Sequence, residues 1–590
     1  MRQLGARMNG GPAGRPVTGL LAAVMASGLA LAGCTTIPTS SSPEVVRSVP
    51  QGASSVAPRP NISPAPGLGP YDIVNDFLGA GVDADAGHST ARQFLTTAAA
   101  RKWQDEPTVI VDETRVGDPI ISGSTATVVV TGRRVGQLDA SGVYTPTLKG
   151  MGTGDEEPFT YTLTRVAGQW RIDQLGTGVL ISQSEFAATY RARRIYFFNS
   201  AGSILVPDLR YTPLEGQSLA TWLLQQLLAG PRPELAQSVT NEVPDQVGKP
   251  SVQIGDPVTV EIPGSQNLDV TSRNGLAAQL AFTLGQAQFA ELRLTDGGKI
   301  VQVPQVQRDA FSAVDFASNS PDNAIPGASV YFVRDGAVYD DTGTPLKSPL
   351  GLPARDLASV AVRRSGNVLE AAGVTVTGKL VAGDENRLSP IALPAAPQSR
   401  PEWAPQGDEI WVGVGSHGAI YRLVSGQRPR PVSVTNQTGG APNGAVTAIR
   451  FSPDGARVAM VIRTPGGPGA VWVGSVVTSG SDVRIDSLEL ETPPRLSVSD
   501  LTWADPTKLL LIAAAPGAQA QLWDMLSDGS QLAPQSSVGL PGAPTAITAA
   551  LQQNPVVSAG GDIFELSNGS WDNLGKSKLA VPGTNPCYAP

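Results

Sequence analysis

The sequence has 590 residues, with 43 Lys and Arg against 51 Asp and Glu, so its formal net charge is −8 at pH 7. An acidic chain with 5% aromatic residues lacks the basic surface that nucleic-acid binding requires, and 41% hydrophobic residues exclude a disordered protein. The 65 Gly and 50 Pro residues indicate a turn-rich, mainly β protein of three or four domains.

The N-terminus has the three parts of a secretory signal. Three arginines and no acidic residue precede Cys34, and the short apolar stretch VTGLLAAVMASGLALAGC follows them. Small residues, Leu31-Ala32-Gly33, stand directly before the cysteine, which is the form of a bacterial lipobox. Residues 1–33 are therefore predicted to be a lipoprotein signal peptide, and an ordinary signal peptide with a chance cysteine is the alternative.

Cys34 is predicted to be the lipidation site, with an S-diacylglycerol group and an N-acyl group on the new N-terminus. Two acyl chains or more hold a protein stably at a membrane, whereas one binds only marginally. Removal of the signal takes away three arginines and leaves a net charge of −11, so the lipid rather than surface charge must hold the chain at the membrane. The other cysteine, Cys587, then has no intramolecular partner and is read as an incidental thiol.

Residues 34–70 show no apolar periodicity and are dense in Pro and Ser. This composition predicts a semi-rigid, extended linker. At about 3.1 Å per residue, the linker could hold the first domain up to roughly 110 Å from the bilayer. The chain is therefore expected to act within or near the cell wall, on the extracytoplasmic face of the cell membrane.

Residues 71–190 are predicted to form an α+β domain of the cone-like, NTF2-like form. YDIVNDFLGAG places four apolar residues on one helical face, and STARQFLTTAAARKW predicts a second helix capped by Ser89 or Thr90. Strands follow, and in FTYTLTRVAGQWRIDQL the side chains alternate with the period of two of a half-buried strand.

Residues 191–310 read as two aromatic-rich strands, a helix with Leu219, Trp222, Leu223 and Leu227 on one face, a second helix, and a hairpin about Asp296-Gly297-Gly298. Ser218 is the expected cap of the first helix and Gly230-Pro231 its end. The strings LVPDLRYTP, LLAGP and AFTLGQ give this segment a resemblance to the GerMN domain, which implies an α+β fold.

Residues 320–590 carry a degenerate repeat, which predicts an all-β propeller of about six blades. Four units place a hydrophobic residue at the same point, at intervals of 41, 48 and 52 residues: Val362, Trp403, Phe451 and Trp503. Each unit then supplies another strand, as in AIYRL or AVWVG. The turn FSPDG also resembles that of TolB-type propeller repeats.

No cofactor-binding or catalytic motif is found. GVGSHG, Gly413 to Gly418, has the letters of a dinucleotide-binding loop, but a strand rather than a helix follows, so it is read as a hairpin turn. The two histidines, His88 and His417, are read as solvated turn residues rather than general bases.

No strong metal site is predicted either. Asp83 and Asp85 supply two of the alternating carboxylates of a calcium loop but lack the third and the closing glutamate, so a polar loop is preferred to a calcium site. The cluster Asp155, Glu156 and Glu157 is read as a solvated loop.

The order of lipobox, Pro/Ser linker, N-terminal domain, GerMN domain and propeller is similar to that of the LpqB family of actinobacterial lipoproteins. The resemblance is carried by LAGC, YFFNSAGSILVPDLRYTP, LLAGP and the propeller units, and it covers essentially the whole chain. It implies an accessory protein of the MtrAB two-component system. Such a protein would bind the extracellular sensor region of an MtrB-type histidine kinase and influence cell-wall homeostasis and division.

Two alternatives remain open beside this non-enzymatic role. A carboxylate-based propeller glycosidase has no fixed spacing of its two acidic residues, so the sequence alone does not exclude it. A lipoprotein that binds cell-wall fragments, in the propeller or in the first domain, is compatible with the accessory role. The N-terminal and GerMN region is the expected surface for the kinase.

Overall fold

The computed structural model describes residues 63–589, except 84–86, 149–155, 245–247, 324–327, 353–355, 406–407, 437–442 and 578. The predicted signal peptide, Cys34 and most of the predicted linker lie outside the described residues. Within the described ranges, no helix combines the length and the apolar character needed to cross a bilayer.

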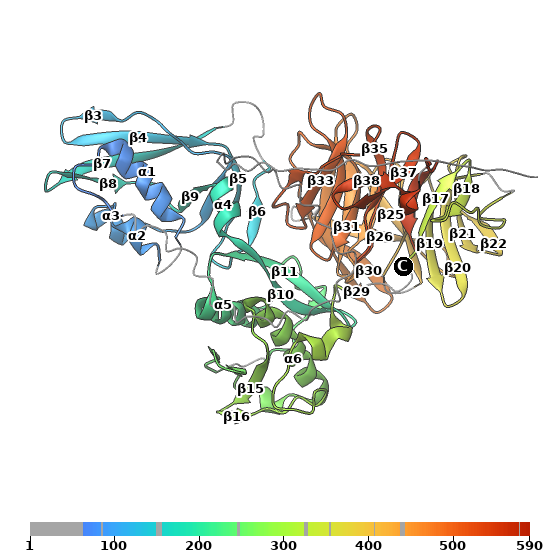
Figure 1. The fold of residues 1–590 in the computed structure, drawn as a ribbon, viewed down its shortest axis with the longest axis horizontal. Coiled ribbons are helices and arrows are strands. Elements are labelled where there is room, and N and C mark those ends of the chain that lie inside the picture. Colours follow the sequence, from blue (N-terminus) through green and yellow to red (C-terminus); the bar gives the residue numbers. More distant parts are fainter. Residues whose placement is uncertain are drawn as a thin grey trace, which may run out of the picture. The chain divides into compact units, whose positions relative to one another are not determined.

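The N-terminal part, up to residue 189, has two sheets and four helices (Figure 1). The helices are α1 (Pro70–Gly81), α2 (Ser89–Arg92), α3 (Thr97–Lys102) and α4 (Gln183–Thr189). One sheet has the order β6 (Tyr144–Pro146), β5 (Arg134–Leu138), β1 (Thr108–Val111), β9 (Val179–Ser182). The other has the order β2 (Arg115–Val116), β4 (Thr125–Gly132), β7 (Glu157–Val166), β8 (Gln169–Gln174), with β3 (Ile120–Ser122) also paired to β4.

The prediction of one capped helix after residue 88 is wrong. The segment forms two short helices, because Leu95 bridges to Ile172 and the Thr96 N–H donates to the carbonyl of Ile172 at 2.8 Å. Thr96 then caps α3 by accepting from the Ala99 N–H at 3.1 Å, whereas neither Ser89 nor Thr90 acts as a cap. Pairing to β8 therefore overrides the helical periodicity.

Residues 191–319 form two small sheets covered by two long helices, α5 (Gly216–Ala229) and α6 (Val270–Leu284), which pack on each other. The sheets run β11 (Leu205–Thr212), β10 (Arg191–Asn199), β12 (Val239–Thr240) and β13 (Ser251–Gln253), β14 (Val258–Glu261), β15 (Leu292–Asp296), β16 (Lys299–Ile300). Three 3-10 turns complete the segment: η1 (Ser265–Asn267), η2 (Gly285–Ala287) and η3 (Ala313–Asn319).

The helix α5 agrees with its predicted face but not with its predicted cap. Leu219, Leu223 and Leu227 are buried, and Gly230, at a φ of 88° that only glycine adopts readily, ends the helix. The helix begins two residues before Ser218, with Glu215 at the N-cap position and no side-chain cap.

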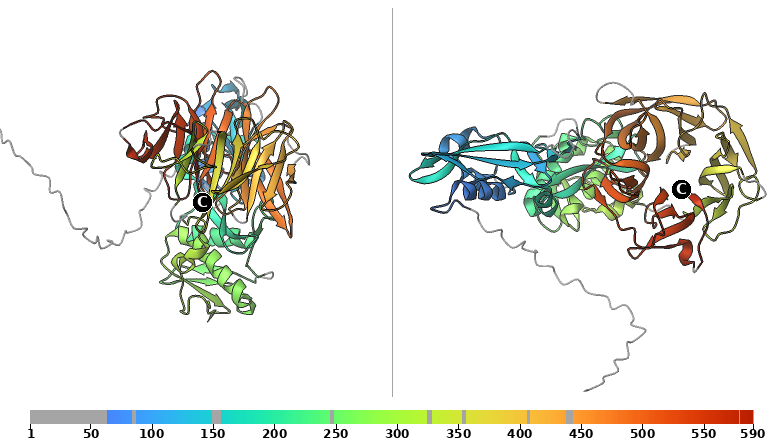
Figure 2. Two further views of the ribbon diagram at one scale, coloured as in Figure 1. Left: turned by 90° about the vertical axis from the view of Figure 1, so that its right-hand side faces the viewer. Right: turned by 90° about the horizontal axis from the view of Figure 1, so that it is seen from above.

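From residue 330 on, the described residues form strands, turns and one short 3-10 helix, arranged around a ring (Figure 2). Three of its sheets have four strands each. The first contains β19 (Leu357–Ser365), β20 (Val368–Thr375), β21 (Leu380–Asp384) and β22 (Arg387–Ile391), and the second contains β31 (Ser497–Asp505), β32 (Lys508–Ala514), β33 (Gln521–Leu526) and β34 (Ala533–Pro534). The third contains β35 (Pro544–Thr548), β36 (Val556–Ala559), β37 (Asp562–Ser567) and β38 (Ser570–Asn573), and the turn η4 (Leu574–Lys576) follows it.

The largest sheet has eight strands in two groups of four. The first group is β23 (Glu402–Trp403), β24 (Glu409–Val414), β25 (Ala419–Val424), β26 (Arg430–Asn436). The second is β27 (Ala445–Phe451), β28 (Arg457–Arg463), β29 (Gly469–Ser479), β30 (Asp482–Leu490). The two groups join where β26 and β30 pair in parallel, and every other pair in this sheet is antiparallel.

The ring is closed by the two ends of this segment. β17 (Val330–Arg334) pairs with β18 (Ala337–Asp340) on one side and with β39 (Thr584–Tyr588) on the other, both antiparallel. The first strand of each four-stranded sheet or group packs against the first strand of the next, in the order β19, β23, β27, β31, β35. The strand β39 lies between β35 and β19. We call these six the inner strands.

A buried polar interface joins β11 to the propeller. All eight residues of β11 are buried. Arg457, at the start of β28, donates from Nη2 to the carbonyl of Pro207 at 2.7 Å. Next to it, Oδ1 of the fully buried Asp208 forms ion pairs with Arg210 Nη1 at 2.8 Å and with Arg232 Nε at 3.1 Å. Separation of the two domains would expose these groups or leave them unpaired, so the domains are expected to unfold together.

Replacement of Phe332 in β17 should test the importance of ring closure. Its ring is 1% exposed and stacks on Tyr339 at 5.8 Å. We expect Phe332→Ala to lower the free energy of unfolding by about 3–5 kcal/mol. Urea unfolding followed by tryptophan fluorescence measures this, and Val538→Ala, at a side chain 67% exposed, is the control. Equal small effects of both substitutions would contradict the assignment.

Candidate functional site

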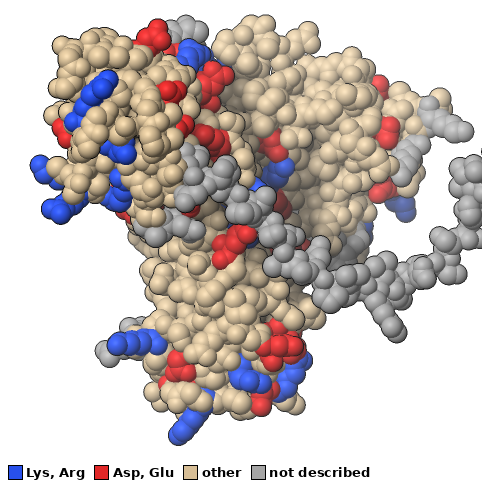
Figure 3. Space-filling model, turned by 60° about the vertical axis from the view of Figure 1, so that its left-hand side comes forward, with Lys and Arg blue, Asp and Glu red and all other residues tan. Residues whose placement is uncertain are grey.

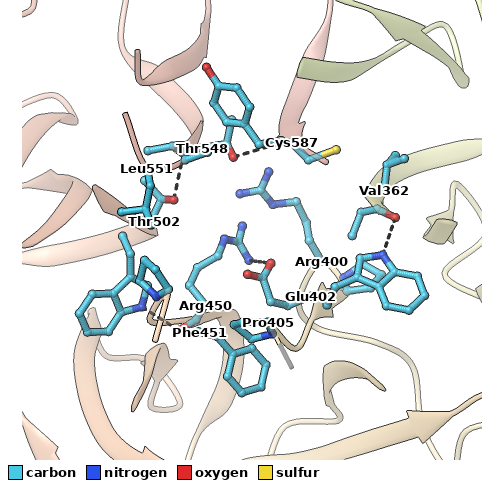
Figure 4. A pocket seen from close by; sticks show the side chains of 18 of the residues that line it. Val362, Arg400, Glu402, Pro405, Arg450, Phe451, Thr502, Thr548, Leu551 and Cys587 are labelled. Carbon is cyan, nitrogen blue, oxygen red and sulfur yellow. Dashed lines mark hydrogen bonds and ion pairs between the residues drawn. The ribbon is translucent and has the colours of Figure 1, made fainter. Parts of the chain in front are cut away.

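A cavity of about 470 Å³ lies at the centre of the inner strands. Figure 4 shows its side chains converging from several sheets. Its walls include residues of all six inner strands, and Ser203, Ile204 and Ser320 of the preceding domain also line it. A volume of this size, with mostly apolar walls and a few polar groups, is typical of a small-molecule site.

The repeat found in the sequence supplies the apolar walls. Val362, Trp403, Phe451 and Trp503 lie on β19, β23, β27 and β31, and all four line the cavity. Trp403 donates from its indole N–H to the carbonyl of Ala361 at 3.2 Å, and Trp503 donates to that of Arg450 at 2.9 Å. The two tryptophans therefore connect β23 to β19 and β31 to β27.

The polar groups of the cavity are held by a buried aspartate. Asp500 Oδ2 accepts from Arg400 Nη2 at 2.6 Å and from the Ile547 N–H at 3.0 Å, and its Oδ1 lies 3.5 Å from Arg450 Nη2. Arg400 also donates to the carbonyls of Pro586, at 3.1 Å, and Ile547, at 3.2 Å. These contacts link five of the six inner strands, β23 through the turn directly before it and β27, β31, β35 and β39 directly, and they fix both guanidinium groups.

Glu402 supplies the second negative charge. Its Oε2 lies 3.4 Å from Arg450 Nη1, and Figure 4 shows this carboxylate beside the Arg450 guanidinium. Burial raises the pKa of Glu402 and lowers the pKa of Arg400, because both lose the solvation of their charged forms. The two arginines, Asp500 and Glu402 together carry no net charge when all are ionised.

The described lining of the cavity combines one carboxylate with two guanidinium groups and aromatic side chains. Among the described residues that line it, Glu402 is the only carboxylate, and Asp500, which contacts both arginines, is not a lining residue. A two-carboxylate glycosidase places both acidic groups on either side of one bond. The aromatic walls and the fixed guanidinium groups suit a ligand with a polar, hydrogen-bond-accepting end and a flat or apolar body.

Cys587 lies on β39 opposite Tyr331 and also lines the cavity. Burial raises the pKa of its thiol to about 12, although Arg400 nearby acts in the opposite direction. At neutral pH the group is therefore a thiol rather than a thiolate.

The other residues singled out from the sequence do not assemble into a site. GVGSHG is part of a hairpin, as predicted: Gly413 and Val414 end β24, and Gly415 to Gly418 form the turn to β25, in which His417 is exposed. The reading of His88 as solvated is wrong, because it is 8% exposed and packs on Trp103 with ring centres 6.2 Å apart. Burial lowers the pKa of His88.

The acidic residues singled out from the sequence are only partly described. Asp85 and Asp155, like Cys34, lie outside the described residues. Glu156 forms an exposed ion pair with Arg115 at 2.7 Å, and Glu157 pairs with Arg134 at 3.0 Å. No group of three or more His, Cys, Asp or Glu side chains in the described ranges is arranged to hold a metal ion.

The polar residues of the cavity were not predicted, although the repeat contained a signal for two of them. Glu402 and Arg450 stand directly before the repeated hydrophobic positions Trp403 and Phe451. Neighbouring residues on a strand point to opposite faces, so a charged residue beside a repeated core position marks the other face of an inner strand. Arg400 and Asp500 each lie three residues before a repeated position, Trp403 and Trp503, and carry no such signal.

Three domain families match the chain. The family described as "Lipoprotein LpqB, N-terminal domain" matches residues 63–187, "Sporulation and spore germination" matches 194–302, and "Lipoprotein LpqB beta-propeller domain" matches 332–589.

Curated relatives named "Lipoprotein LpqB" match over most of their length. The protein of Rhodococcus jostii (strain RHA1) is 28% identical over 526 residues, which are 81% of this chain and 84% of that protein. The protein of Mycobacterium ulcerans (strain Agy99) is 30% identical over 529 residues, 82% and 84% of the two chains. The protein of Mycobacterium tuberculosis (strain CDC 1551 / Oshkosh) is 30% identical over 522 residues, 81% and 83%.

Among solved structures, TolB of Acinetobacter baumannii matches with a TM-score of 0.32 and 16% identity, over 45% of this chain and 68% of that chain. TolB of Agrobacterium tumefaciens matches with a TM-score of 0.30 and 13% identity, over 44% and 90%. Similarities of this size carry no argument about function.

Removal of the Asp500 charge should destabilise the propeller. Asp500→Asn leaves two buried arginines without their shared carboxylate, and we expect the free energy of unfolding to fall by about 3–5 kcal/mol. Chemical denaturation of the chain 35–590 measures this. The control is Asp335→Asn, whose side chain is 75% exposed and lies 3.9 Å from Arg334, because such a surface pair contributes little. A change within experimental error for Asp500→Asn would show that the arginines do not depend on it.

Cys587 should resist alkylation in the folded protein. With a pKa of about 12, only about one thiol in ten thousand is a thiolate near pH 8, far less than in an unfolded chain. We expect iodoacetamide to label Cys587 of the chain 35–590 rapidly in denaturant and hardly at all without it, as mass spectrometry would detect. Similar rates in both conditions would mean that the thiol is not held as described.

Proposed function

The chain belongs to the LpqB lipoprotein family, and on that premise we propose that it is a lipid-anchored, extracytoplasmic accessory protein of a two-component system. It binds the extracellular sensor region of an MtrB-type histidine kinase and so modulates signalling that controls cell-wall homeostasis and division. It acts by contact rather than by catalysis. A modulator of this kind must bind one signalling state of the kinase more tightly than the other.

Attachment to the membrane through Cys34 supports the proposal physically. The linker of residues 34–70 separates the domains from the bilayer, and tethering to the membrane that holds the kinase raises the effective concentration of both partners. A weak contact is then sufficient.

The observation that carries a protein-binding role is the exposed apolar edge at β3. Ile120 and Ile121 are 73% and 57% exposed, and all three residues of this strand are exposed. Such an edge offers apolar side chains together with backbone groups that can pair with a strand of a partner. Charge does not mark a comparable contact surface on the face drawn in Figure 3, where Lys and Arg are interspersed with Asp and Glu and most of the area is uncharged.

The central cavity supports a second candidate function, the binding of a cell-wall fragment. Its size, aromatic walls and fixed guanidinium groups suit such a ligand, and binding there is compatible with contact to a kinase. A glycosidase is less well supported, because Glu402 alone among the described lining residues is acidic.

Two finer features of the fold belong to the same proposal. The six inner strands around one closed ring support a count of six blades. The eight-stranded sheet then counts as two blades, whose described strands pair with each other through β26 and β30 alone. The packing of α1 on strands β4, β8 and β9 supports a cone-like, NTF2-like class for the first domain.

Binding of the chain 35–590 to the kinase's extracellular domain tests the proposal. We expect saturable binding that Ile120→Asp/Ile121→Asp weakens at least about tenfold, because the apolar anchors are lost. Val376→Asp/Val538→Asp is the matched control, since these propeller side chains are 65% and 67% exposed. The whole chain is used because separated domains would expose the charged interface at β11.

Absence of saturable binding, even at the concentrations that co-tethering produces, would remove the direct-contact mechanism and favour the wall-fragment function. Equal weakening by both double variants would leave the kinase as partner but overturn β3 as the contact surface.

A further inference from the structure

A second cavity, of about 310 Å³, lies away from the centre of the propeller. Its walls come from β6, from the turn after α5, from β29 and β30, and from the turn after β33. Apolar and aromatic side chains form one part of the wall, among them Tyr144, Pro146, Trp472 and Leu488. The other part is acidic. We call this space the acidic cavity.

Four carboxylates line the acidic cavity: Glu234, Glu489, Glu491 and Asp528. Arg232 is the only cation among its described lining residues. The Arg232 Nε is already 3.1 Å from Asp208, at the interface with β11. When all of these groups are ionised, the cavity therefore has a negative charge that its own lining does not neutralise.

Glu491 distinguishes this cavity from an ordinary acidic surface. It is 4% exposed, and among the described residues its carboxylate has no hydrogen-bond or ion-pair partner. Its backbone is fixed, because the Glu491 N–H donates to the carbonyl of Val471 at 2.9 Å and the Val471 N–H donates to Thr492 Oγ1 at 2.9 Å. A buried carboxylate is costly unless something pairs with it. In the same wall, the buried Oδ2 of Asp528 has no hydrogen-bond partner among the described residues, so the cavity holds buried carboxylate oxygens that a bound cation would pair with.

The neighbours of Glu491 increase this cost. Burial, together with Glu489 and Asp528, raises its pKa well above the ordinary value, and the attraction of Arg232 does not offset them. Burial, and after it the negative charge of Glu234, raise the pKa of Glu489 to about 7. Asp528 is 2% exposed and accepts from Ser530 through Oδ1 at 2.7 Å.

The missing partner is better matched by an organic cation than by a metal ion. Within the described ranges, no three of the acidic groups stand close enough together to act as metal ligands. The wall formed by Trp472, Leu488 and Pro146 suits an aliphatic chain, and a primary ammonium group donates up to three hydrogen bonds to carboxylates.

We propose that the acidic cavity binds an aliphatic primary amine, with the ammonium group paired to Glu491 and the alkyl chain against the apolar wall. The amine is either a free diamine or the side chain of a lysine-like residue in a peptide. This site is independent of the kinase contact and of the central cavity.

Calorimetric titration of the chain 35–590 with 1,5-diaminopentane tests the proposal, with pentan-1-ol as the uncharged analogue. We expect saturable binding of the amine and none of the alcohol. Glu491→Gln should weaken the amine at least about tenfold, because a charged acceptor is lost. The matched control is Glu113→Gln, whose side chain is 72% exposed and lies outside the cavity.

Thermal unfolding without the amine gives a readout that a purely structural role for Glu491 would not produce. A structural carboxylate stabilises the fold, whereas an unpaired one destabilises it. We therefore expect Glu491→Gln to raise the melting temperature of the free protein while it weakens amine binding. A lower melting temperature together with unchanged affinity would overturn the proposal.

The pH dependence provides a further check. The titratable groups that face Glu491 are Arg232 and Glu234 after α5, Glu489 on β30, Asp528 after β33 and Tyr144 on β6. Because the carboxylates must be ionised to pair with an ammonium group, amine affinity should fall as the pH is lowered from about 8 to about 5.5. Amine binding should also release protons.

The source of the amine is distinguished by a parallel titration with Nα-acetyl-lysine methylamide. Tighter binding of this compound than of the free diamine would assign the site to a peptide side chain, and the reverse order to a free diamine. No heat and no change in melting temperature with either amine at millimolar concentration would overturn the proposal. That result would leave the kinase and wall-fragment functions unaffected.

Discussion

The pairing of β17 with β39 is the constraint on which the propeller depends. A propeller whose first and last sheets do not meet leaves strand edges unpaired and its core open. Here the last strand, β39, pairs with the first, β17, and completes the sheet that β17 and β18 form. β39 thereby becomes one of the six inner strands. Its carbonyl at Pro586 accepts from Arg400, and Cys587 and Tyr588 form one wall of the central cavity. The central cavity is therefore complete only when β39 has closed the ring.

Neighbouring inner strands are held together by side chains, because they belong to different ladders of backbone hydrogen bonds. The tryptophans at repeated positions donate hydrogen bonds to carbonyls of the preceding inner strand. Asp500 contacts two arginines and a backbone N–H, which come from three neighbouring segments. Thr502 likewise accepts from the Ala549 N–H at 3.1 Å. The buried charges at the centre thus fix the spacing of the sheets, and they also leave both guanidinium groups at the cavity wall. Structural and binding roles are shared by the same residues.

Much of the fold could be predicted from local pattern. The period of two in β7, the helical face of α5 and the repeat through Trp403 and Trp503 all appear in the sequence because each is fixed by burial within one element. The sequence-based predictions were wrong where contacts with a distant segment determine the local structure or the burial of a residue. Leu95 leaves the helix because it bridges to Ile172, and His88 is buried because Trp103 covers it. Asp500 and Glu491 could not be assigned roles from the sequence, because their surroundings are built from segments far apart in the chain.

Closure of the ring also determines the order in which the chain can acquire its structure. The two strands that close it are about 250 residues apart, and β39 is synthesised after every other strand described. Contacts between distant residues form slowly, because the entropy lost in closing a long loop comes before the contact contributes any stabilising free energy. A nascent propeller therefore has an unpaired β17 edge until its last strand arrives. Loss of a few residues at the C-terminal end of this segment would consequently do more harm than insertions of similar size in its surface turns.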